Sequence, residues 1–140
     1  MDQPQSIDLS KYMGKWYEIQ RSENSFQKKC VARASTEYTL FQNGYVRIQN
    51  ACRTARGISK VSGWGWVTDN TNTRLRVSFL PIPRTILRHI PLVSGRYDIV
   101  YVDANYSVAI VRSGKLYWIL SRNRTMSALV VNRLIDAHIR

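Results

Sequence analysis

The side chains able to do chemistry are few in this chain and lie far apart. It has 2 cysteines, Cys30 and Cys52, and 2 histidines, His89 and His138. Neither cysteine has a base beside it, and no Ser, His and Asp set or carboxylate pair is discernible, so nothing indicates nucleophilic or acid–base catalysis. The spacing of these residues is also not that of metal ligands. We expect no enzyme, no metal site and no cofactor.

The cysteines bracket a predicted hairpin of strands over about 31–41 and 44–52, joined by a turn at Asn43 and Gly44. This turn places Cys52 roughly opposite Arg33, so Cys30 falls a few residues beyond its ideal partner. A bulge or a curled strand start closes such a gap. We therefore expect a Cys30–Cys52 disulfide if the protein is exported, and two thiols if it stays in a reducing cytosol.

Composition predicts one β-rich domain over residues 1–140. The chain is 44% hydrophobic and contains 4 Trp and 8 Tyr, which is typical of a packed β fold. No apolar run approaches the roughly 20 residues of a spanning helix. The net charge of +12 attracts anionic partners, but the basic residues are spread along the chain without a long run, which argues against specific nucleic-acid binding.

Alternating hydrophobicity predicts strands over about 15–21, 31–41, 44–52, 58–68, 73–80, 95–103, 106–112 and 115–122. Residues 1–10 are polar, and we expect them to be loosely attached. After Arg122 the period changes, and Ser127 followed by an apolar stripe predicts a helix over 128–139. The expected fold is all-β: an eight-stranded antiparallel up-and-down barrel with a C-terminal helix packed outside.

One end of this barrel is expected to be closed by Trp16, which follows Gly14 at the start of the first strand. The last predicted strand ends in Arg122. A guanidinium at that position can stack on the indole of Trp16 and hydrogen-bond to nearby carbonyls. The first and last strands are therefore expected to be neighbours.

Three blocks of sequence support a family resemblance: Gly14 to Ile19 with Trp16 and Tyr17, then Tyr97 to Tyr106, then Tyr117 to Arg122. In order and spacing they resemble the three signature regions of the lipocalins. The chain is most similar to the branch that holds bacterial outer-membrane lipocalins, plant temperature-induced lipocalins and apolipoprotein D. The resemblance implies the same barrel and helix, and a structural role for Asp103 and Tyr106 in bracing the closed end.

Alternation and family position together predict the side chains that point inward and line a ligand pocket. They are Tyr38, Leu40, Val46, Ile48, Leu75, Val77, Phe79, Tyr97, Ile99, Tyr101, Val108 and Trp118, with Ile110 and Leu120 as further inward positions. Trp118 is expected to touch ligand, and the alternative is that it fills a packed interior. In the fourth strand the resemblance places Gly63 and Gly65 inward and one or both of Trp64 and Trp66 outside, whereas periodicity does not decide.

Two loops are expected at the pocket mouth. The first contains Phe26, Lys28 and Lys29, and the second, residues 81–92, combines three prolines with aliphatic and cationic side chains. Exposed aliphatics in a loop need a reason. The loop could be exposed because its tip touches a membrane. The alternatives are that it forms a lid over the pocket or a contact between subunits. The second loop supplies Arg84, Ile86, Leu87, Arg88 and Ile90.

The expected function is binding and transport or storage of a small hydrophobic ligand, such as a fatty acid or lysophospholipid, at or away from a membrane surface. The alternative is a non-catalytic basic module that binds acidic macromolecules or anionic membranes. A homodimer is left open. The first residues show no signal peptide, so the compartment stays undecided: membrane, periplasm or outer membrane if a signal was removed, and cytoplasm otherwise.

Overall fold

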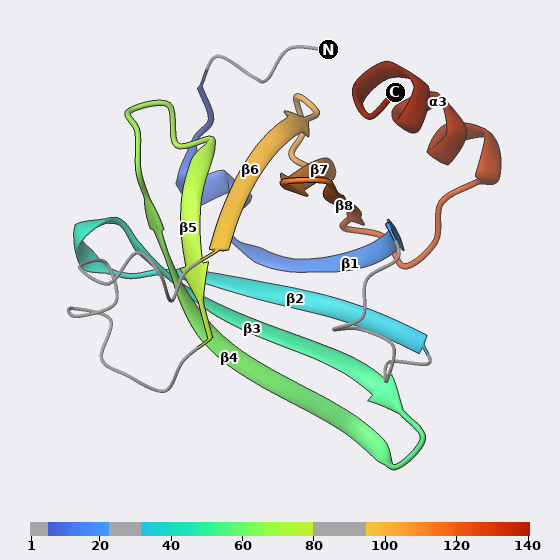
Figure 1. The fold of residues 1–140 in the computed structure, drawn as a ribbon, viewed down its shortest axis with the longest axis horizontal. Helices are drawn as coiled ribbons and strands as arrows, with labels where there is room; N and C mark the ends of the chain where they lie inside the picture. Colours follow the sequence, from blue (N-terminus) through green and yellow to red (C-terminus); the bar gives the residue numbers. More distant parts are fainter. Residues whose placement is uncertain (1–5, 23–31, 80–94) are drawn as a thin grey trace.

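The chain forms a closed eight-stranded antiparallel barrel with a helix on its outside, as predicted (Figure 1). The computed structural model describes residues 6–22, 32–79 and 95–140. The strands follow one another around the barrel in chain order, and the last pairs with the first. They are β1 Gly14–Arg21, β2 Ala32–Leu40, β3 Tyr45–Thr54, β4 Gly57–Val67, β5 Arg74–Ser78, β6 Gly95–Val102, β7 Val108–Ser113 and β8 Leu116–Ser121. The helices are α1 Leu9–Tyr12, the 3-10 turn η2 Gln42–Gly44 and α3 Ala128–His138.

The hairpin of β2 and β3 has the register that its turn predicts. Tyr38 lies opposite Ile48, and Leu40 lies opposite Val46. Gly44 adopts a φ of +76° in the turn, a conformation that a residue without Cβ reaches without strain. This register places one alternating face of each strand toward the barrel interior.

The interior contains one hydrophobic cluster to which most strands contribute. Trp16, Ile99 and Ala109 in it are fully buried. The end of the barrel that holds α1 and the connections β2–β3, β4–β5 and β6–β7 is called the closed end below, and the opposite end is called the open end. The other buried members of the interior cluster are Ile7, Tyr12, Tyr38, Val46, Ile48, Leu75, Val111 and Leu120.

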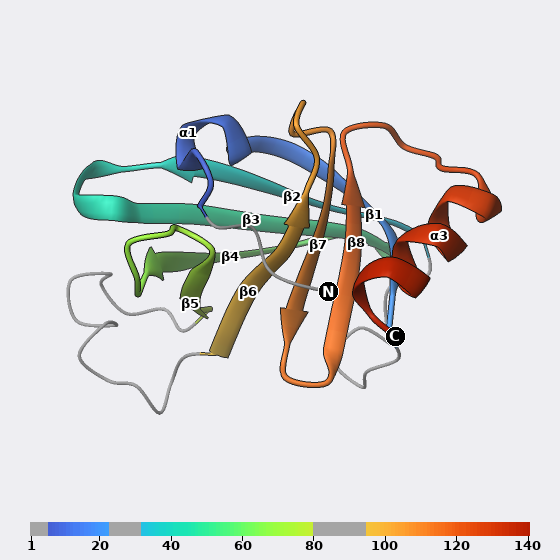
Figure 2. The same ribbon diagram turned by 90° about the horizontal axis from the view of Figure 1, so that it is seen from above.

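A second cluster lies outside the barrel, where α3 packs beside β7 and β8 (Figures 1 and 2). The helix begins as predicted, because the Ser127 hydroxyl accepts a hydrogen bond from the Val130 N–H at 3.3 Å. Val131 and Ile135 then bury against Ile110 and Ile119 of the barrel wall. The outer face of these strands is therefore apolar as well as the inner one.

Because the barrel wall under α3 is buried on both faces, part of the predicted set of inward-facing residues is wrong. Tyr101 and Ile110 belong to the outer cluster, and Val108 shares the face of Ile110 because it lies two residues before it on β7. The prediction that these three point inward is wrong. In β6 the register shifts between Ile99 and Tyr101, so Tyr101 faces outward although it lies two residues after the inward-facing Ile99. In β7 both faces are apolar, so alternation in the sequence does not show which of them is inside.

The N-terminal segment is also more firmly held than predicted. Ile7 and Tyr12 are only 6% and 2% exposed. The Ile7 N–H donates to the Thr71 carbonyl at 3.0 Å, and the Asp8 N–H donates to the Tyr106 hydroxyl at 2.8 Å. The prediction of loose attachment through residue 10 is therefore wrong from Ile7 onward, while residues 1–5 lie outside the described ranges.

Within the described ranges, no helix has the length and apolar character needed to span a bilayer.

Candidate functional site

The closed end is sealed by Trp16 and Arg122, as the sequence predicts. The guanidinium carbon of Arg122 lies 3.7 Å from the centre of the Trp16 ring, and the indole N–H donates to the Tyr12 carbonyl at 2.8 Å. The same guanidinium donates to four carbonyl oxygens, those of Lys15 at 2.9 Å, Lys11 at 3.0 Å, Met13 at 2.8 Å and Tyr106 at 3.0 Å. Arg122 thus joins the segment before β1 to the β6–β7 connection.

Gly14 is part of this seal for two reasons. Its φ is +98°, where a side chain is strained. A Cβ on Gly14 would also lie 3.3 Å from Nη1 of Arg122. The backbone must therefore come close to the guanidinium at this point, and only glycine permits it without displacement.

The β6–β7 connection is braced by Asp103. Its carboxylate accepts hydrogen bonds from the Ser107 N–H at 2.6 Å, from the Val108 N–H at 2.9 Å and from the Ser107 hydroxyl. Burial acts to raise the pKa of Asp103, but these hydrogen bonds outweigh it and hold the pKa below its usual range. The Tyr106 hydroxyl in the same turn holds Asp8. Tyr17 lies under the cations of Lys15 and Arg124.

Above this seal three tyrosines meet inside the barrel. The Tyr97 hydroxyl lies 2.6 Å from that of Tyr12 and 2.7 Å from that of Tyr38. Burial raises the pKa of all three, that of Tyr12 and Tyr97 well above the usual value. These phenols are therefore neutral hydrogen-bonding groups over the physiological pH range, and their rings fill much of the closed-end half.

A small cavity remains beside the tyrosines. Its volume is about 10 Å³, which is roughly what one water molecule needs. The predicted pocket residues among its walls are Tyr38, Val46, Ile48, Leu75, Val77 and Tyr97, and the sequence reasoning missed Leu9, Tyr12 and Met13. The sequence feature that could have located these three residues is Asp8, which caps the four-residue helix α1. The structure brings the six predicted side chains together, and ligand contact with them stays a prediction.

At the open end, apolar side chains of the inner wall remain exposed. Val61 and Phe79 are 43% and 40% exposed. Val61 shares the inner face of β4 with Gly63, which lies opposite the buried Ile48. A Cβ on Gly63 would lie 2.6 Å from the Phe79 ring, so this ring occupies the space that a side chain would fill. The interior surface therefore continues toward solvent at this end.

The fourth strand also settles the orientation of its tryptophans. A Cβ on Gly65 would lie 3.3 Å from Cδ1 of Ile48 in the interior. Trp64 and Trp66 face outward and form a separate cluster with Tyr45. The guanidinium carbon of Arg47 lies 5.0 Å from the Trp64 ring centre. The glycine face is thus inward, as the family resemblance implies.

A polar pair that the sequence reasoning missed lies on the inner face of β1. The β1–β8 register shifts between Glu18 and Gln20, so Glu18 is opposite Leu120 and Arg21 is opposite Trp118. Both partners belong to or pack on the interior cluster. Because directly opposed residues share a face, Glu18 and Arg21 both face inward. Alternation alone gives no signal for this shift.

The remaining predicted pocket residues lie at different depths. Ile99 is fully buried and Trp118 packs on the interior cluster. Leu40 lies next to the β2–β3 turn and is 41% exposed. Tyr101 and Val108 lie on the outer face, as described above. Among the described residues, no group of three or more His, Cys, Asp or Glu side chains is placed to hold a metal ion.

The predicted mouth residues and one cysteine lie outside the described ranges. The mouth residues are Phe26, Lys28, Lys29, Arg84, Ile86, Leu87, Arg88 and Ile90. Cys52 is 8% exposed and carries no free thiol. The β2–β3 pair has a register shift between Ala32 and Ser35, in the region where a bulge was expected. Since Cys30 is not described, the Cys30–Cys52 disulfide stays a prediction.

Comparison with protein sequences gives matches over nearly the whole chain. The family model of the Lipocalin-like domain matches residues 7–139. The lipocalin-type protein R877 of Acanthamoeba polyphaga mimivirus is 34% identical over 131 residues, which cover 93% of this chain and 75% of that protein. Temperature-induced lipocalin-1 of Arabidopsis thaliana is 29% identical over 140 residues, covering 97% of this chain and 74% of that protein. Outer membrane lipoprotein Blc of Vibrio cholerae is 29% identical over 141 residues, covering 93% and 73%.

Solved structures share the fold at lower sequence identity. Insecticyanin from Manduca sexta has a TM-score of 0.71 and 15% identity, covering 98% of this chain and 77% of that one. The cockroach allergen Per a 4 has a TM-score of 0.68 and 21% identity, covering 97% and 82%. These similarities concern the barrel architecture alone.

Proposed function

Because the chain belongs to the lipocalin family, we propose that it binds, and carries or stores, a fatty acid, a lysophospholipid or a similar lipid inside its barrel. Lipocalins generally bind small hydrophobic ligands and are typically not enzymes. Within the family, the lipid class and the use of the open-end half of the barrel are what we propose for this chain.

The observation that supports the proposal most directly is the apolar inner wall at the open end. Val61 and Phe79 face the interior and remain 43% and 40% exposed. Deeper in the barrel, Val77 and Trp118 continue this surface toward the interior cluster. Apolar area of this kind is stabilised when an apolar guest removes it from water.

The closed-end half restricts where the guest can lie. Its cavity of about 10 Å³ is far below the ~300–1,000 Å³ of ordinary ligand sites. The hydrogen-bonded rings of Tyr12, Tyr38 and Tyr97 occupy that half. An acyl chain is therefore expected between the tyrosines and the open end, with interior side chains moving to admit it.

The energy required is modest. Each buried methylene contributes ~0.8 kcal/mol, and a micromolar dissociation constant corresponds to about 8 kcal/mol. About ten buried methylenes therefore suffice before the costs of association are subtracted. A single acyl chain of ordinary length contains this number of methylenes.

The test begins with native mass spectrometry and lipid extraction on protein purified without detergent, followed by displacement of a fluorescent fatty acid. A co-purifying or competitively displaced lipid is the expected result. A barrel that retains no lipid and displaces no probe would contradict the proposal.

A matched pair of variants on β4 separates interior binding from adsorption to the surface. Val61→Asp places a charge on the inner face at the open end, and we expect it to weaken probe binding. Ile58→Asp places the same charge on the outer face of the same strand, where Ile58 is 64% exposed, and we expect no change. Equal loss in both variants would mean that the probe binds outside the barrel.

The basic outer surface supports a second candidate, binding of acidic macromolecules or anionic membranes. The net charge is +12, and Arg47 and Arg76 lie on neighbouring outer faces, opposite Trp64 and Trp66. Binding of this kind weakens steeply with salt. Salt-sensitive binding to DNA or anionic vesicles by a protein that displaces no fatty acid would favour this candidate.

A further inference from the structure

The inner face of β1 presents a carboxylate and a guanidinium side by side, although their spacing predicts opposite faces. Glu18 and Arg21 are three residues apart, so regular alternation would turn one of them outward. The register shift between Glu18 and Gln20 reverses the alternation. As a result Arg21, rather than Gln20, faces Trp118 across the strand pair.

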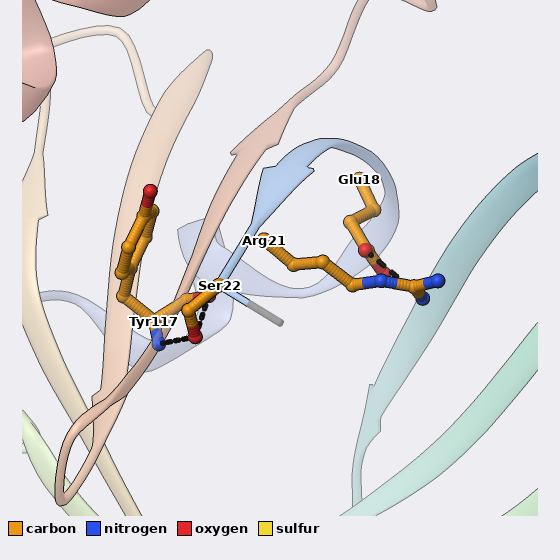
Figure 3. A network of polar contacts seen from close by, with 4 residues as sticks. All are labelled: Glu18, Arg21, Ser22 and Tyr117. Carbon is orange, nitrogen blue, oxygen red and sulfur yellow. Dashed lines mark hydrogen bonds and ion pairs between the residues drawn. The ribbon is translucent and has the colours of Figure 1, made fainter. Parts of the chain in front are cut away.

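The residue that follows Arg21 is hydrogen-bonded to β8, and this fixes the direction of the Arg21 side chain. The Ser22 N–H donates to the Tyr117 carbonyl at 3.0 Å, and the Tyr117 N–H donates to the Ser22 hydroxyl at 2.9 Å. Gln20 donates from Nε2 to the Tyr117 hydroxyl at 3.2 Å on the outer face. Figure 3 shows Glu18 and Arg21 extending together toward the side of β2, away from the Tyr117 ring.

The pair is largely removed from water but not tightly joined. The side chains of Glu18 and Arg21 are 13% and 25% exposed, and Oε1 lies 3.4 Å from Nη1. A charge-assisted hydrogen bond is ~2.7–2.9 Å long, so Glu18 is a weak counter-ion. Burial raises the pKa of Glu18, and the attraction of Arg21 only partly offsets this effect.

We propose that Arg21 is the headgroup site of the barrel and binds the carboxylate of a single-chain fatty acid, which takes the place of the Glu18 carboxylate. This rests on the proposed lipid-binding function. The guanidinium matches a carboxylate in a planar, two-pronged geometry. Glu18 shows that a carboxylate reaches this position, and Trp118 and Leu120 provide apolar surface beside it.

The experiment compares two ligands with the same chain, dodecanoic acid and dodecanol, as competitors of a fluorescent probe on the full chain at about pH 8, where the acid is ionised. We expect Arg21→Gln to weaken dodecanoate about tenfold or more, the loss of a charge-assisted hydrogen bond, and to leave dodecanol unchanged. Glu18→Gln removes the competing charge, and we expect it to tighten dodecanoate several-fold without affecting dodecanol.

Arg133→Gln is the matched control, because it removes one positive charge from an exposed position of α3. We expect it to change neither ligand, and far-UV circular dichroism confirms that each variant is folded. Equal weakening of acid and alcohol in Arg21→Gln, or no weakening of either, would overturn the headgroup site. Should Arg21→Gln fail to fold, no tightening of dodecanoate by Glu18→Gln would overturn it. Wild-type protein that binds dodecanol but not dodecanoate also contradicts it, whereas binding of neither ligand refutes the barrel function itself.

Discussion

Removing the guanidinium of Arg122 is the sharpest perturbation of the closed end. In Arg122→Ala the Trp16 ring loses the cation 3.7 Å from its centre. Four carbonyl oxygens lose their donor, which are those of Lys11, Met13, Lys15 and Tyr106. We expect a large loss of stability, with the ligand preference of the folded protein unchanged because Arg122 lies outside the proposed binding region.

The magnitude follows from which of these contacts are shielded from water. The hydrogen bonds to Lys11 and Lys15 are exposed, so water replaces the donor at little cost, whereas those to Met13 and Tyr106 are partly buried. At about 1.5 kcal/mol for each partly buried charged hydrogen bond and ~0.5–1 kcal/mol for the cation–π contact, the expected loss is about 3.5–4 kcal/mol.

Urea unfolding followed by far-UV circular dichroism measures this loss. Arg122→Lys keeps the charge but not the planar fork, so we expect about half of the effect. Arg124→Ala is the control, because Arg124 is exposed and its guanidinium carbon lies 5.5 Å from the Tyr17 ring centre, so its removal should cost far less stability than the removal of Arg122. Arg122→Ala within about 1 kcal/mol of wild type, or Arg122→Lys as stable as wild type, would refute the argument.

Three further predictions concern the backbone and the interior. Gly14→Ala should lower the free energy of unfolding by about 1–3 kcal/mol, because its φ of +98° strains a side chain; an unchanged urea midpoint would contradict this. Tyr97→Phe removes the hydroxyl that joins Tyr12 and Tyr38, and we expect a loss of about 1–3 kcal/mol from the buried phenols left without it, whereas a more stable variant would show that those phenols find other partners. Burial raises the pKa of Glu18 above its usual value, so the folded state favours the protonated carboxyl. Wild type should therefore lose stability relative to Glu18→Gln as the pH rises from about 3.5 to 7. Urea titrations at both pH values measure this difference, and a difference that does not vary with pH would disprove the shift.

The parts of the fold that the sequence predicts correctly depend on local or strongly periodic signals. The turn at Asn43 and Gly44 determines the β2–β3 register, and Ser127 marks the start of α3. The pairing of first and last strands follows from the complementary chemistry of Trp16 and Arg122. Each of these residue types favours one local conformation or one kind of contact, so the sequence pattern and the structure agree.

The parts of the fold that the sequence does not predict correctly depend on contacts between distant segments. Helix α1 has only four residues, too few for a period to show. It is held by the Asp8 cap and by the burial of Tyr12. Tyr101 was placed on the wrong face because the β6 register shifts after Ile99, and Ile110 was misplaced because α3 makes the outer side of β7 as apolar as the inner side. Hydrophobic alternation reports burial, and here burial occurs on both faces.

The register shift in β1 shows why the interior chemistry of such a barrel does not follow from composition. Without the shift, alternation would place Gln20 inside and Arg21 outside, and the inner wall beside Trp118 would present a neutral amide. With the shift it presents a cation next to Glu18. The amino-acid sequence is the same in both cases, so the register shift alone decides whether the inner wall beside Trp118 attracts a carboxylate. Barrels of the same family and similar composition can therefore differ in ligand charge preference wherever their first strands differ by one such shift.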